Sequence, residues 1–293
     1  RRRAAGGRAM SARALFLRDD LAAAWRGREP FAQAATQTGE VYRAREGRRT
    51  LRFEAAGRSY FLKYHGSIGW REIIKNLTQA KAPVLGAMSE VRAIRAVAAA
   101  GIDTLTIAGY GCRGANPARQ ESFLVTDELS DTVSLEELGE AWRLEPGPAP
   151  FKWALIRRVG EIARAMHGAG VNHRDFYLGH FLIDRGAVAG HDAGAPLYLI
   201  DLHRSQVRKT VPRRWRNKDV GGLYYSTARL DLTHRDLLRF VRAYTGQPLR
   251  EALREHAALW RASRKEAEKI YRRYFEIEPS FPLRYCEHPG KDI

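Results

Sequence analysis

Hydrophobic and polar residues alternate along the early part of the chain with the period of two that β-strands require. Residues 50–54 and 59–63 are two such runs, and residues 55–58 between them carry the glycine of a hairpin turn. Residues 122–129 form a more continuous apolar run that ends in polar residues, which predicts a buried strand. The first part of the chain is therefore expected to be mostly β.

Later segments follow the helical period instead. Residues 152–167 carry apolar side chains on one helical face, namely Leu155, Val159, Ile162, Ala163 and Met166. Ser89 is expected to cap a helix over residues 90–97, and residues 233–236 form a capping-box pattern that opens another helix. Apolar spacing among dense charges over residues 251–274 predicts a further helix.

Taken with the motif His173-Arg174-Asp175 and the later Asp201, this order of elements predicts an α+β, protein-kinase-like two-lobed fold with a small, mostly-β N-lobe and a larger helical C-lobe. A chain of 293 residues is long enough for two lobes that share a cleft. The strand that ends near residue 128 suits a hinge whose backbone groups bind an adenine edge. We expect a basic, disordered N-terminal tail (1–24), a nucleotide-binding N-lobe (25–128), a C-lobe with the catalytic loop and acceptor site (129–275) and a C-terminal tail (276–293).

Composition narrows the compartment and the partners. Two cysteines, Cys112 and Cys286, are too few for a disulfide framework and suit a reducing compartment. No stretch approaches the roughly 18 apolar residues of a spanning helix. Fifty Lys and Arg against 33 Asp and Glu give a net charge of +17, which attracts anionic lipid or another polyanion. A nucleic-acid partner is not expected, because the basic residues are not interleaved with aromatic residues as in a stacking surface.

The most informative motif is His173-Arg174-Asp175. It follows the helix over residues 152–167 and a Gly-Ala-Gly turn, and two strand-like runs come after it, the second of which leads into Asp201. A kinase-like catalytic lobe presents a base and a metal ligand to ATP in this order. Asp175 would orient a hydroxyl and accept its proton, and Asp201 would hold Mg²⁺, which prefers oxygen ligands. His173 is expected to pack beneath the loop rather than to act as a base.

Two residues of the first part would complete the nucleotide site. Lys63 ends the strand-like run 59–63, where its ammonium group could reach the α- and β-phosphates of ATP. Glu90, in the first turn of the next helix, is the favoured ion-pair partner of Lys63, and Glu72 is the alternative. The simpler roles are a solvent-facing strand lysine and an acid that complements a helix dipole.

The chain departs from ordinary protein kinases in three places. A Gly-rich loop is missing, and Arg48 and Arg49 stand in the corresponding turn, where they either contact phosphates or lie on a solvated hairpin tip. His180 stands five residues after Asp175, where protein kinases carry Asn, and it either binds Mg²⁺ or hydrogen-bonds to Asp175. Asp201 is followed by Leu-His rather than Phe-Gly. These differences favour a divergent kinase of a small molecule or a glycolipid.

Beyond single motifs, the chain from about residue 25 to residue 267 resembles the lipopolysaccharide core heptose(I) kinases of Gram-negative bacteria. The resemblance is carried by residues 39–43 (GEVYR), 46–53 (EGRRTLRF), 60–63 (YFLK), 72–77 (EIIKNL), 83–87 (PVLGA), 172–175 (NHRD), 200–204 (IDLHR) and 211–219 (VPRRWRNKD). The histidine that this family carries after its His-Arg-Asp motif falls on His180. Phe176, Leu178 and Gly179 replace the Cys, Ile and Cys usual in the family, which affects the packing of the loop more than its chemistry.

The resemblance implies ATP- and Mg²⁺-dependent transfer of the γ-phosphoryl group to the 4-hydroxyl of the first heptose of the inner core, at the cytoplasmic face of the inner membrane. The expected partners are the inner-core glycolipid and the anionic membrane surface, with an acidic protein as a further candidate. Seven Lys or Arg and no acid lie between residues 204 and 218, on the stretch that lines the acceptor side in kinase-like folds. The residues expected to bind the acceptor are Arg204, Arg213, Arg214, Arg216 and Lys218.

Other functions stay open on the sequence alone. The enzyme could phosphorylate another inner-core sugar, such as the Kdo acid, or a protein tyrosine. The missing Gly-rich loop would also suit a kinase-like protein without activity that binds a membrane or an acidic partner. The presence together of Lys63, Glu90, Asp175 and Asp201 favours the enzyme.

Overall fold

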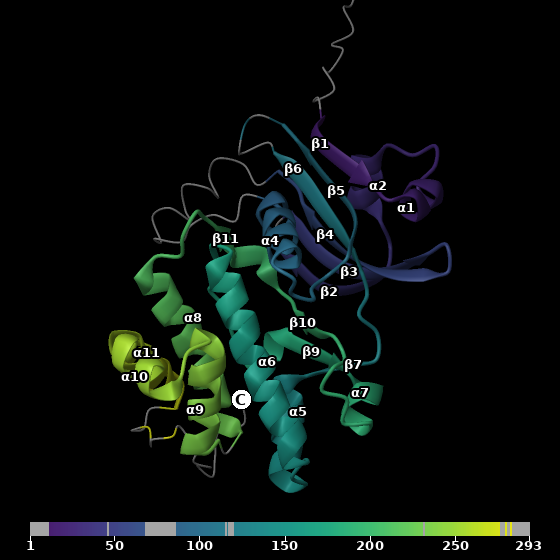
Figure 1. Cartoon of the computed structure of the whole chain (residues 1–293). Helices are drawn as coiled ribbons and strands as arrows, with labels where there is room; N and C mark the ends of the chain where they lie inside the picture. The colour runs from purple at the N-terminus through teal and green to yellow at the C-terminus, as the bar shows by residue number, and fades with distance from the viewer. Residues whose placement is uncertain are drawn as a thin grey trace, which may run out of the picture. The chain divides into compact units, whose positions relative to one another are not determined.

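The structure is a computed structural model of the chain. It describes residues 12–45, 47–67, 86–114, 116, 120–230, 232–275, 279 and 282. The chain divides into two compact units (Figure 1). The first unit comprises Arg1–Arg92 and Leu105–Leu129, and the second comprises Ala93–Thr104 and Ser130–Ile293.

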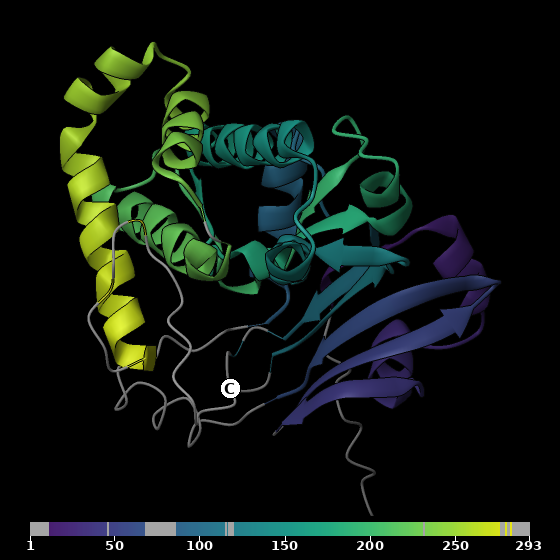
Figure 2. The ribbon, with the colours of Figure 1, turned by 90° about the horizontal axis from the view of Figure 1, so that it is seen from below.

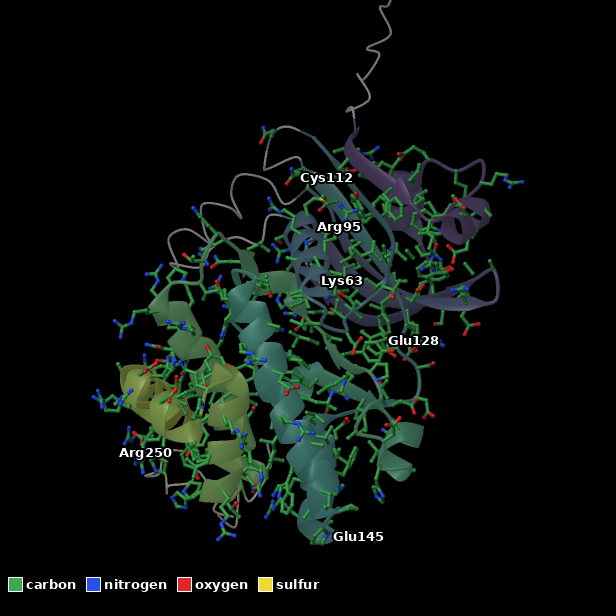
Figure 3. The ribbon with its side chains drawn as sticks, viewed as in Figure 1. Lys63, Arg95, Cys112, Glu128, Glu145 and Arg250 are labelled. Carbon is green, nitrogen blue, oxygen red and sulfur yellow. The ribbon has the colours of Figure 1, made fainter. Side chains whose placement is uncertain are left out.

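An antiparallel sheet of six strands forms the first unit. Its strands are β1 (Ala12–Leu17), β2 (Glu40–Arg45), β3 (Arg48–Ala55), β4 (Arg58–His65), β5 (Ile107–Arg113) and β6 (Glu121–Asp127), in the order β1-β5-β6-β4-β3-β2. The predicted hairpin is confirmed, because β3 and β4 pair up to Ala55 and Arg58 and leave Ala56-Gly57 as the turn. Both turn residues have positive φ, 50° and 72°, as two-residue hairpin turns favour. Lys63 lies on β4, one of the two central strands (Figure 3).

Two short helices, α1 (Asp19–Ala24) and α2 (Pro30–Thr36), complete the core of the first unit. This core includes Leu21, Trp25, Phe31, Phe53, Tyr60 and Phe123. The expectation of a disordered tail over residues 1–24 is wrong for residues 12–24, because β1 pairs with β5 and Leu21 is fully buried. Residues 1–11 lie outside the described residues.

Helices dominate the second unit. They are α5 (Leu135–Leu144), α6 (Ala149–Gly168), α7 (Arg185–Ala189), α8 (Arg213–Ser226), α9 (His234–Thr245), α10 (Leu249–Glu255) and α11 (Ala257–Phe275), with single 3₁₀ turns η2 (Leu178–His180), η3 (Leu202–Arg204) and η4 (Thr227–Arg229). The strands are β7 (Thr132–Ser134), β9 (Phe181–Asp184) and β10 (Leu197–Leu199) in one small sheet, and β8 (Val171–Asn172) and β11 (Gln206–Val207) in another. α6 packs on α9, and α11 packs along α8 (Figure 2).

Local sequence explains where several helices begin and end. In the predicted apolar stripe of α6, Leu155, Val159, Ala163 and Met166 are buried and Ile162 is half-buried. The capping box at residues 233–236 is present, with Thr233 and Asp236 hydrogen-bonded to each other's backbone. Two boundaries differ from the prediction. α4 (Met88–Ala99) starts one residue before Ser89, which therefore lies inside the first turn, and the helix expected over residues 251–274 is divided between α10 and α11 at His256.

The α+β class with a mostly-β first part and a helical second part is confirmed. In the described part of the chain, no helix combines the length and the apolar character needed to cross a bilayer. Most of the C-terminal segment 276–293 lies outside the described residues.

Candidate active site

The loop between β8 and η2 carries His173, Arg174 and Asp175 in an unusual backbone conformation. Arg174 has a φ of 77°, in the left-handed region that residues other than glycine rarely occupy. The Asp219 carboxylate, on α8, accepts hydrogen bonds from the backbone N–H groups of His173 and Arg174, both at 2.8 Å. Backbone strain of this kind persists only where the surroundings fix it. Asp219 therefore holds the shape of the catalytic loop.

Asp219 is a functional residue that sequence reasoning missed. It is 1% exposed, and an acid is rarely so buried unless it is paired. His167 on α6 supplies a further contact, with its Nε2 atom 3.2 Å from Asp219 Oδ2 and its Nδ1 atom 2.9 Å from the Tyr244 hydroxyl. The only sequence signal was an acid directly after a long basic run, and the loop that it binds lies some 45 residues away.

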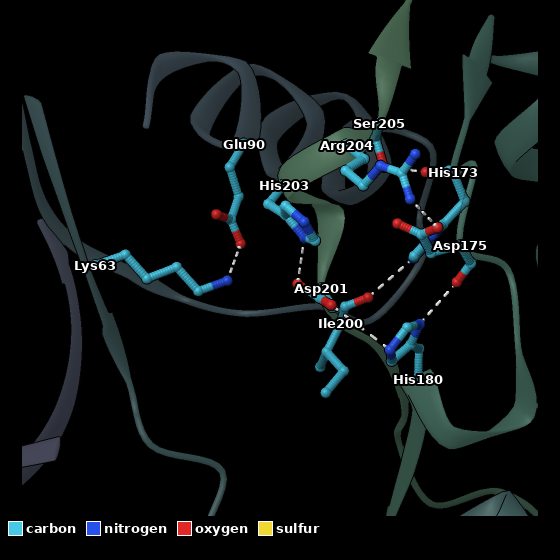
Figure 4. Close-up of polar contacts among 10 residues, drawn as sticks. All are labelled: Lys63, Glu90, His173, Asp175, His180, Ile200, Asp201, His203, Arg204 and Ser205. Carbon is cyan, nitrogen blue, oxygen red and sulfur yellow. Dashed lines mark hydrogen bonds and ion pairs between the residues drawn. The ribbon is translucent and has the colours of Figure 1, made fainter. Parts of the chain in front are cut away.

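The Asp175 side chain lies at the end of this braced loop, and 16% of it is exposed. Its Oδ1 atom accepts a hydrogen bond from Nη1 of Arg204 at 2.6 Å (Figure 4). Oδ2 accepts no hydrogen bond from the described residues. A general base must be within hydrogen-bond reach of the proton that it takes, and Oδ2 is the oxygen of Asp175 that could accept such a hydrogen bond.

Asp201 occupies the end of the small sheet in a second left-handed conformation, with φ 58°. Its Oδ1 atom lies 2.6 Å from Nδ1 of His203, and its Oδ2 atom lies 3.5 Å from Nε2 of His180 (Figure 4). His203 is another residue whose part in the site the sequence did not indicate. Asp175 and Asp201 are thus joined through His180, because Nδ1 of His180 also lies 2.7 Å from the backbone carbonyl of Asp175.

The hydrogen bonds around His180 bear on metal binding. A carbonyl oxygen only accepts, so Nδ1 of His180 carries the proton, and in the neutral ring Nε2 presents a lone pair toward Asp201 Oδ2. Two acceptors that face each other at 3.5 Å suit a cation between them. Among the described residues there is no group of three or more His, Cys, Asp or Glu that could hold a metal ion. Mg²⁺ is commonly held by one or two carboxylates together with substrate phosphates and water, so the Asp201 carboxylate is the residue best suited to it, and the imidazole of His180 is a weaker ligand.

His173 packs beneath the loop, as the sequence predicted. Its ring is fully buried and stacks on His180 at 5.6 Å between centroids, and its Nε2 atom lies 2.9 Å from the Ile200 carbonyl. Burial lowers the pKa of His173, so the ring is neutral and donates this hydrogen bond. The contact links the catalytic loop to the residue before Asp201.

The first unit contains the ion pair expected of a nucleotide site. Nζ of Lys63, on β4, lies 2.6 Å from Oε1 of Glu90, on α4 (Figure 4). The Glu90 side chain is only 2% exposed, so its charge depends on this partner. Glu90 is thus a partner of Lys63, while the alternative, Glu72, lies outside the described residues.

The two arginines of the expected phosphate-contacting turn differ. Nη2 of Arg49 donates to the backbone carbonyls of Ala35 and Gln37, at 2.8 and 3.0 Å, and so satisfies the end of α2. This contact gives Arg49 a structural role that neither sequence interpretation included. Arg48 begins β3 and stays a candidate for phosphate contact.

A cluster of cations surrounds the start of α8. The helix begins at Arg213 after Pro212, has no side-chain cap and no acid in its first turn, and so presents unpaired N–H groups and the positive end of its dipole. The guanidinium groups of Arg174 and Arg214 each lie 5.0 Å from the centre of the Trp215 ring, and Nζ of Lys218 lies 5.4 Å from it.

These cations have few internal partners. In the part of the chain that the structure describes, Arg213, Arg214, Arg216 and Lys218 form no ion pair, and Nε of Arg216 is buried without a hydrogen bond. Cations at the positive end of a helix dipole are unfavourable unless an anion joins them. Burial, followed by the nearby charge of Arg204, lowers the pKa of Arg174. The arrangement therefore favours an anionic ligand.

Comparisons with known proteins agree with this site. Residues 32–244 match the model of the lipopolysaccharide kinase (Kdo/WaaP) family. The lipopolysaccharide core heptose(I) kinase WaaP of Pseudomonas aeruginosa is 49% identical over 259 residues, which cover 88% of this chain and 96% of that protein. The kinase of the same name from Escherichia coli K12 is 44% identical over 257 residues, covering 88% and 97%. A solved structure described as WaaP in complex with acyl carrier protein is 44% identical, with a TM-score of 0.76 over 88% of this chain and 99% of that one. The chain belongs to the lipopolysaccharide kinase (Kdo/WaaP) family.

Proposed function

We propose that this protein is a kinase that transfers the γ-phosphoryl group of ATP to the 4-hydroxyl of the first heptose of the lipopolysaccharide inner core. The observation that carries the proposal is that His180 links two carboxylates, Asp175 and Asp201. The buried Asp219 holds the loop that carries Asp175. Relatives named as core heptose(I) kinases, at 44–49% identity over most of their length, support the choice of acceptor.

Asp175 acts as the base in this proposal. As the acceptor oxygen forms its bond to the γ-phosphorus, the bond from that phosphorus to the β-γ bridging oxygen breaks, ADP departs, and the hydroxyl proton passes to Oδ2 of Asp175. Arg204 on Oδ1 keeps the carboxylate oriented. Phosphoryl transfer depends mainly on positioning and on compensation of charge, so a fixed carboxylate and a nearby guanidinium are the groups that it needs.

Asp201 and His180 are the residues that would hold Mg²⁺. When bound, the ion would neutralise charge on the β- and γ-phosphate oxygens. His203 fixes the rotamer of Asp201 through its 2.6 Å contact to Oδ1, which leaves Oδ2 directed toward His180. This assignment requires Nε2 of His180 to be unprotonated, so that only Nδ1, which donates to the Asp175 carbonyl, carries a proton.

Lys63 and Arg48 are the proposed cations for the triphosphate, and Glu90 is the residue that orients Lys63. Lys63 on a central strand is held at one end by the sheet and at the other by a buried carboxylate. A point charge fixed in this way suits the α- and β-phosphates.

The acceptor site is proposed at the start of α8. An inner core that carries carboxylates and phosphates is a polyanion, and Arg213, Arg214, Arg216 and Lys218 offer cations without internal ion-pair partners among the described residues. Arginine binds carboxylate and phosphate groups through paired hydrogen bonds. The same charges would attract an anionic membrane surface. We therefore expect the enzyme at the cytoplasmic face of the inner membrane, where ATP and the nascent glycolipid meet.

An acidic protein partner is a second part of the proposal. The related WaaP structure was solved with acyl carrier protein, and the +17 charge of this chain suits such a partner. The second unit also contains a cavity of about 920 Å³ between α5, α6, α8 and α9. Its lining is largely apolar and includes Leu138, Trp142, Leu155, Val159, Leu223 and Leu238. A cavity of this size and character suits an acyl chain.

The carrier proposal is tested by comparing acylated and unacylated carrier protein. The acylated form should bind more tightly, and Ile156→Trp, which narrows the cavity, should remove the difference while the melting temperature is retained. If acylated and unacylated carrier protein bind with equal affinity, the acyl chain does not enter the cavity and the two proteins interact only through their surfaces.

The central test of function uses purified protein, Mg²⁺-ATP and lipopolysaccharide acceptors that differ only at the first heptose. Phosphate should appear on the acceptor with a free 4-hydroxyl, as read by mass spectrometry and phosphorus NMR, and not on the acceptor blocked at that position. Phosphate on another sugar or on a protein tyrosine would replace this function with one of the alternatives. Thermal stabilisation by Mg²⁺-ATP without any product would indicate an inactive binding protein.

A further inference from the structure

A row of three tyrosines begins two residues after the catalytic Asp175. We propose that this tyrosine row, Tyr177, Tyr225 and Tyr274, is a binding subsite for the sugar rings of the acceptor oligosaccharide. The inference rests on the proposed function, because it assigns the place where the sugar acceptor of that reaction lies. It is separate from the cations at the start of α8, which bind charge rather than sugar rings.

The three rings come from different elements and lie in sequence. Tyr177 precedes η2, Tyr225 is on α8 and Tyr274 is near the end of α11. The centroids of Tyr177 and Tyr225 are 6.4 Å apart in an edge arrangement, and those of Tyr225 and Tyr274 are 5.8 Å apart in a stacked one. The ring of Tyr177 also lies 6.2 Å from His180. The row therefore leads away from the catalytic loop.

Glycine on α8 lets the first ring lie close to the helix. A Cβ atom at Gly222 would lie 3.2 Å from Cε1 of Tyr177 and 3.3 Å from the backbone carbonyl of Phe176. These distances are tight enough that a larger residue would displace the ring. The position of Tyr177 beside Asp175 thus depends on the absence of a side chain at Gly222.

The exposure of the row separates it from the aromatic core. Tyr274 is 65% exposed, and Tyr177 and Tyr225 are partly exposed, whereas Tyr60 and Tyr271 are fully buried. Aromatic rings that are left on the surface offer apolar area to a ligand, and Tyr177, the first ring of the row, lies two residues after Asp175.

The hydroxyl groups of the row also differ from those of the core. The hydroxyl of Tyr60 donates to Asp20 at 2.9 Å, and that of Tyr244 lies 2.9 Å from His167. The hydroxyls of Tyr177 and Tyr274 have no hydrogen-bond partner among the described residues.

The exposed ring area of the row and the hydroxyls of Tyr177 and Tyr274 match the chemistry of a sugar. A sugar presents a face of C–H groups, which packs on an aromatic ring, and a rim of hydroxyls, which exchange hydrogen bonds with tyrosine. An acyl chain would pack on the rings but has no group that exchanges hydrogen bonds with the hydroxyls of Tyr177 and Tyr274. The reacting sugar would lie at Tyr177, next to Asp175, and the following sugars of the oligosaccharide would lie at Tyr225 and Tyr274.

The test measures binding directly, with the deacylated inner-core oligosaccharide that lacks phosphate on the first heptose. Calorimetry gives its affinity for the full chain, and saturation-transfer NMR reports which sugar C–H protons lie against the protein. Tyr274→Leu removes the ring but keeps an apolar side chain, and it should weaken oligosaccharide binding about three- to tenfold, the range expected for one aromatic stacking contact. Tyr274→Phe keeps the ring and should retain most of the affinity.

Tyr42 supplies the matched control, because it is similarly exposed, at 58%, but lies in the first unit. Tyr42→Leu should leave oligosaccharide affinity unchanged, and the affinity of the Tyr274 variants for ATP should equal that of the wild type. Unchanged oligosaccharide affinity in Tyr274→Leu, or a loss of ATP affinity instead, would overturn the subsite. If the wild type binds the oligosaccharide through these rings but phosphorylates no heptose, the proposed function fails while the subsite stands.

Discussion

Arginine side chains serve different purposes in the two units. In the first unit, Arg18 reaches Asp20 and Asp127, Arg52 reaches Glu128 and Glu54, and Arg113 reaches Glu121 and Glu29. In the second unit, the basic run over residues 204–218 contains one described ion pair, Arg204 with Asp175. These three arginines of the first unit are thus compensated within the fold, whereas the four cations at the start of α8, Arg213, Arg214, Arg216 and Lys218, are left for a ligand.

Arginine thus has two roles in this cationic chain: pairing with acids and binding a ligand. Ion pairs at the surface contribute little to stability, so pairing mainly fixes geometry, for example at Asp127 and Glu128 where the first unit ends. Cations that lack acids and stand at the start of a helix are costly in the free protein and become favourable when an anion binds. Substitutions in the two groups should therefore affect different measurements.

The largest effect on turnover is expected at Asp175, which forms an ion pair with Arg204 of the basic run. Asp175→Ala removes the group that accepts the hydroxyl proton, so turnover should fall by roughly 10²-fold or more while ATP affinity changes little. Asp192→Ala is the matched control, since Asp192 is an exposed acid of the same unit that bonds only to its own turn. Near-normal turnover in Asp175→Ala would mean that another group is the base.

Asp201→Asn should raise the Mg²⁺ concentration required for half-maximal activity by about tenfold, because a neutral amide is a weaker ligand for a hard cation. Direct titration with Mg²⁺ in the presence of ATP, followed by calorimetry, gives a readout that does not depend on turnover. The same Mg²⁺ affinity in both proteins would place the metal ligand elsewhere.

Lys63→Ala tests whether the first unit binds ATP and not the glycolipid. It should raise the KM for ATP several-fold and leave the KM for the glycolipid unchanged. It should also lower the melting temperature, because Glu90 is 2% exposed and loses a cation that compensates its charge. An increase in the glycolipid KM alone would contradict the division of roles between the units.

The smallest effect is expected for the paired arginine of the first unit. Hydrogen bonds from Arg18 hold the pKa of Asp20 well below its ordinary value. A depressed carboxyl pKa adds stability above the unfolded value, near ~3.9, and that stability is lost as the pH falls through the folded pKa. Arg18→Ala should thus lower the melting temperature by about 2–4 °C at pH 7 and flatten its fall between about pH 5 and pH 2. If the melting temperatures of the wild type and Arg18→Ala fall in parallel with pH, the Arg18–Asp20 pair does not cause the loss of stability in acid.

The placement of the candidate site residues on local elements could be predicted from the sequence. Asp175 and Asp201 follow recognisable turns and strands, and Lys63 and Glu90 follow from strand alternation and a helix start. Two other placements could not be predicted from periodicity. Asp219 reaches the loop through a tertiary contact, and His203 meets Asp201 where Asp201 has a positive φ. The first strand and helix were missed for a similar reason, because residues 12–24 become ordered only through pairing with β5 and burial of Leu21.

Arg49 illustrates the reverse case. Its expected position in a turn suggested either phosphate contact or a solvated hairpin tip, whereas it lies on β3 and donates to the carbonyls at the end of α2. Sequence spacing indicates which residues are close along the chain. It does not indicate which unpaired carbonyls at a helix end a long side chain will contact in the fold.

The most direct test of the account compares the salt dependence of the glycolipid KM in three proteins: the wild type, Arg213→Ala/Arg214→Ala, and Arg52→Ala as the control with a paired arginine. In the wild type, KM should rise with salt, because screening is substantial at a Debye length near ~8 Å. The double variant should have a several-fold higher KM at low salt and a flatter salt dependence, with an unchanged KM for ATP, while Arg52→Ala behaves as the wild type toward the glycolipid. Equal glycolipid KM in the wild type and the double variant at low salt would contradict the account and place acceptor binding away from the start of α8.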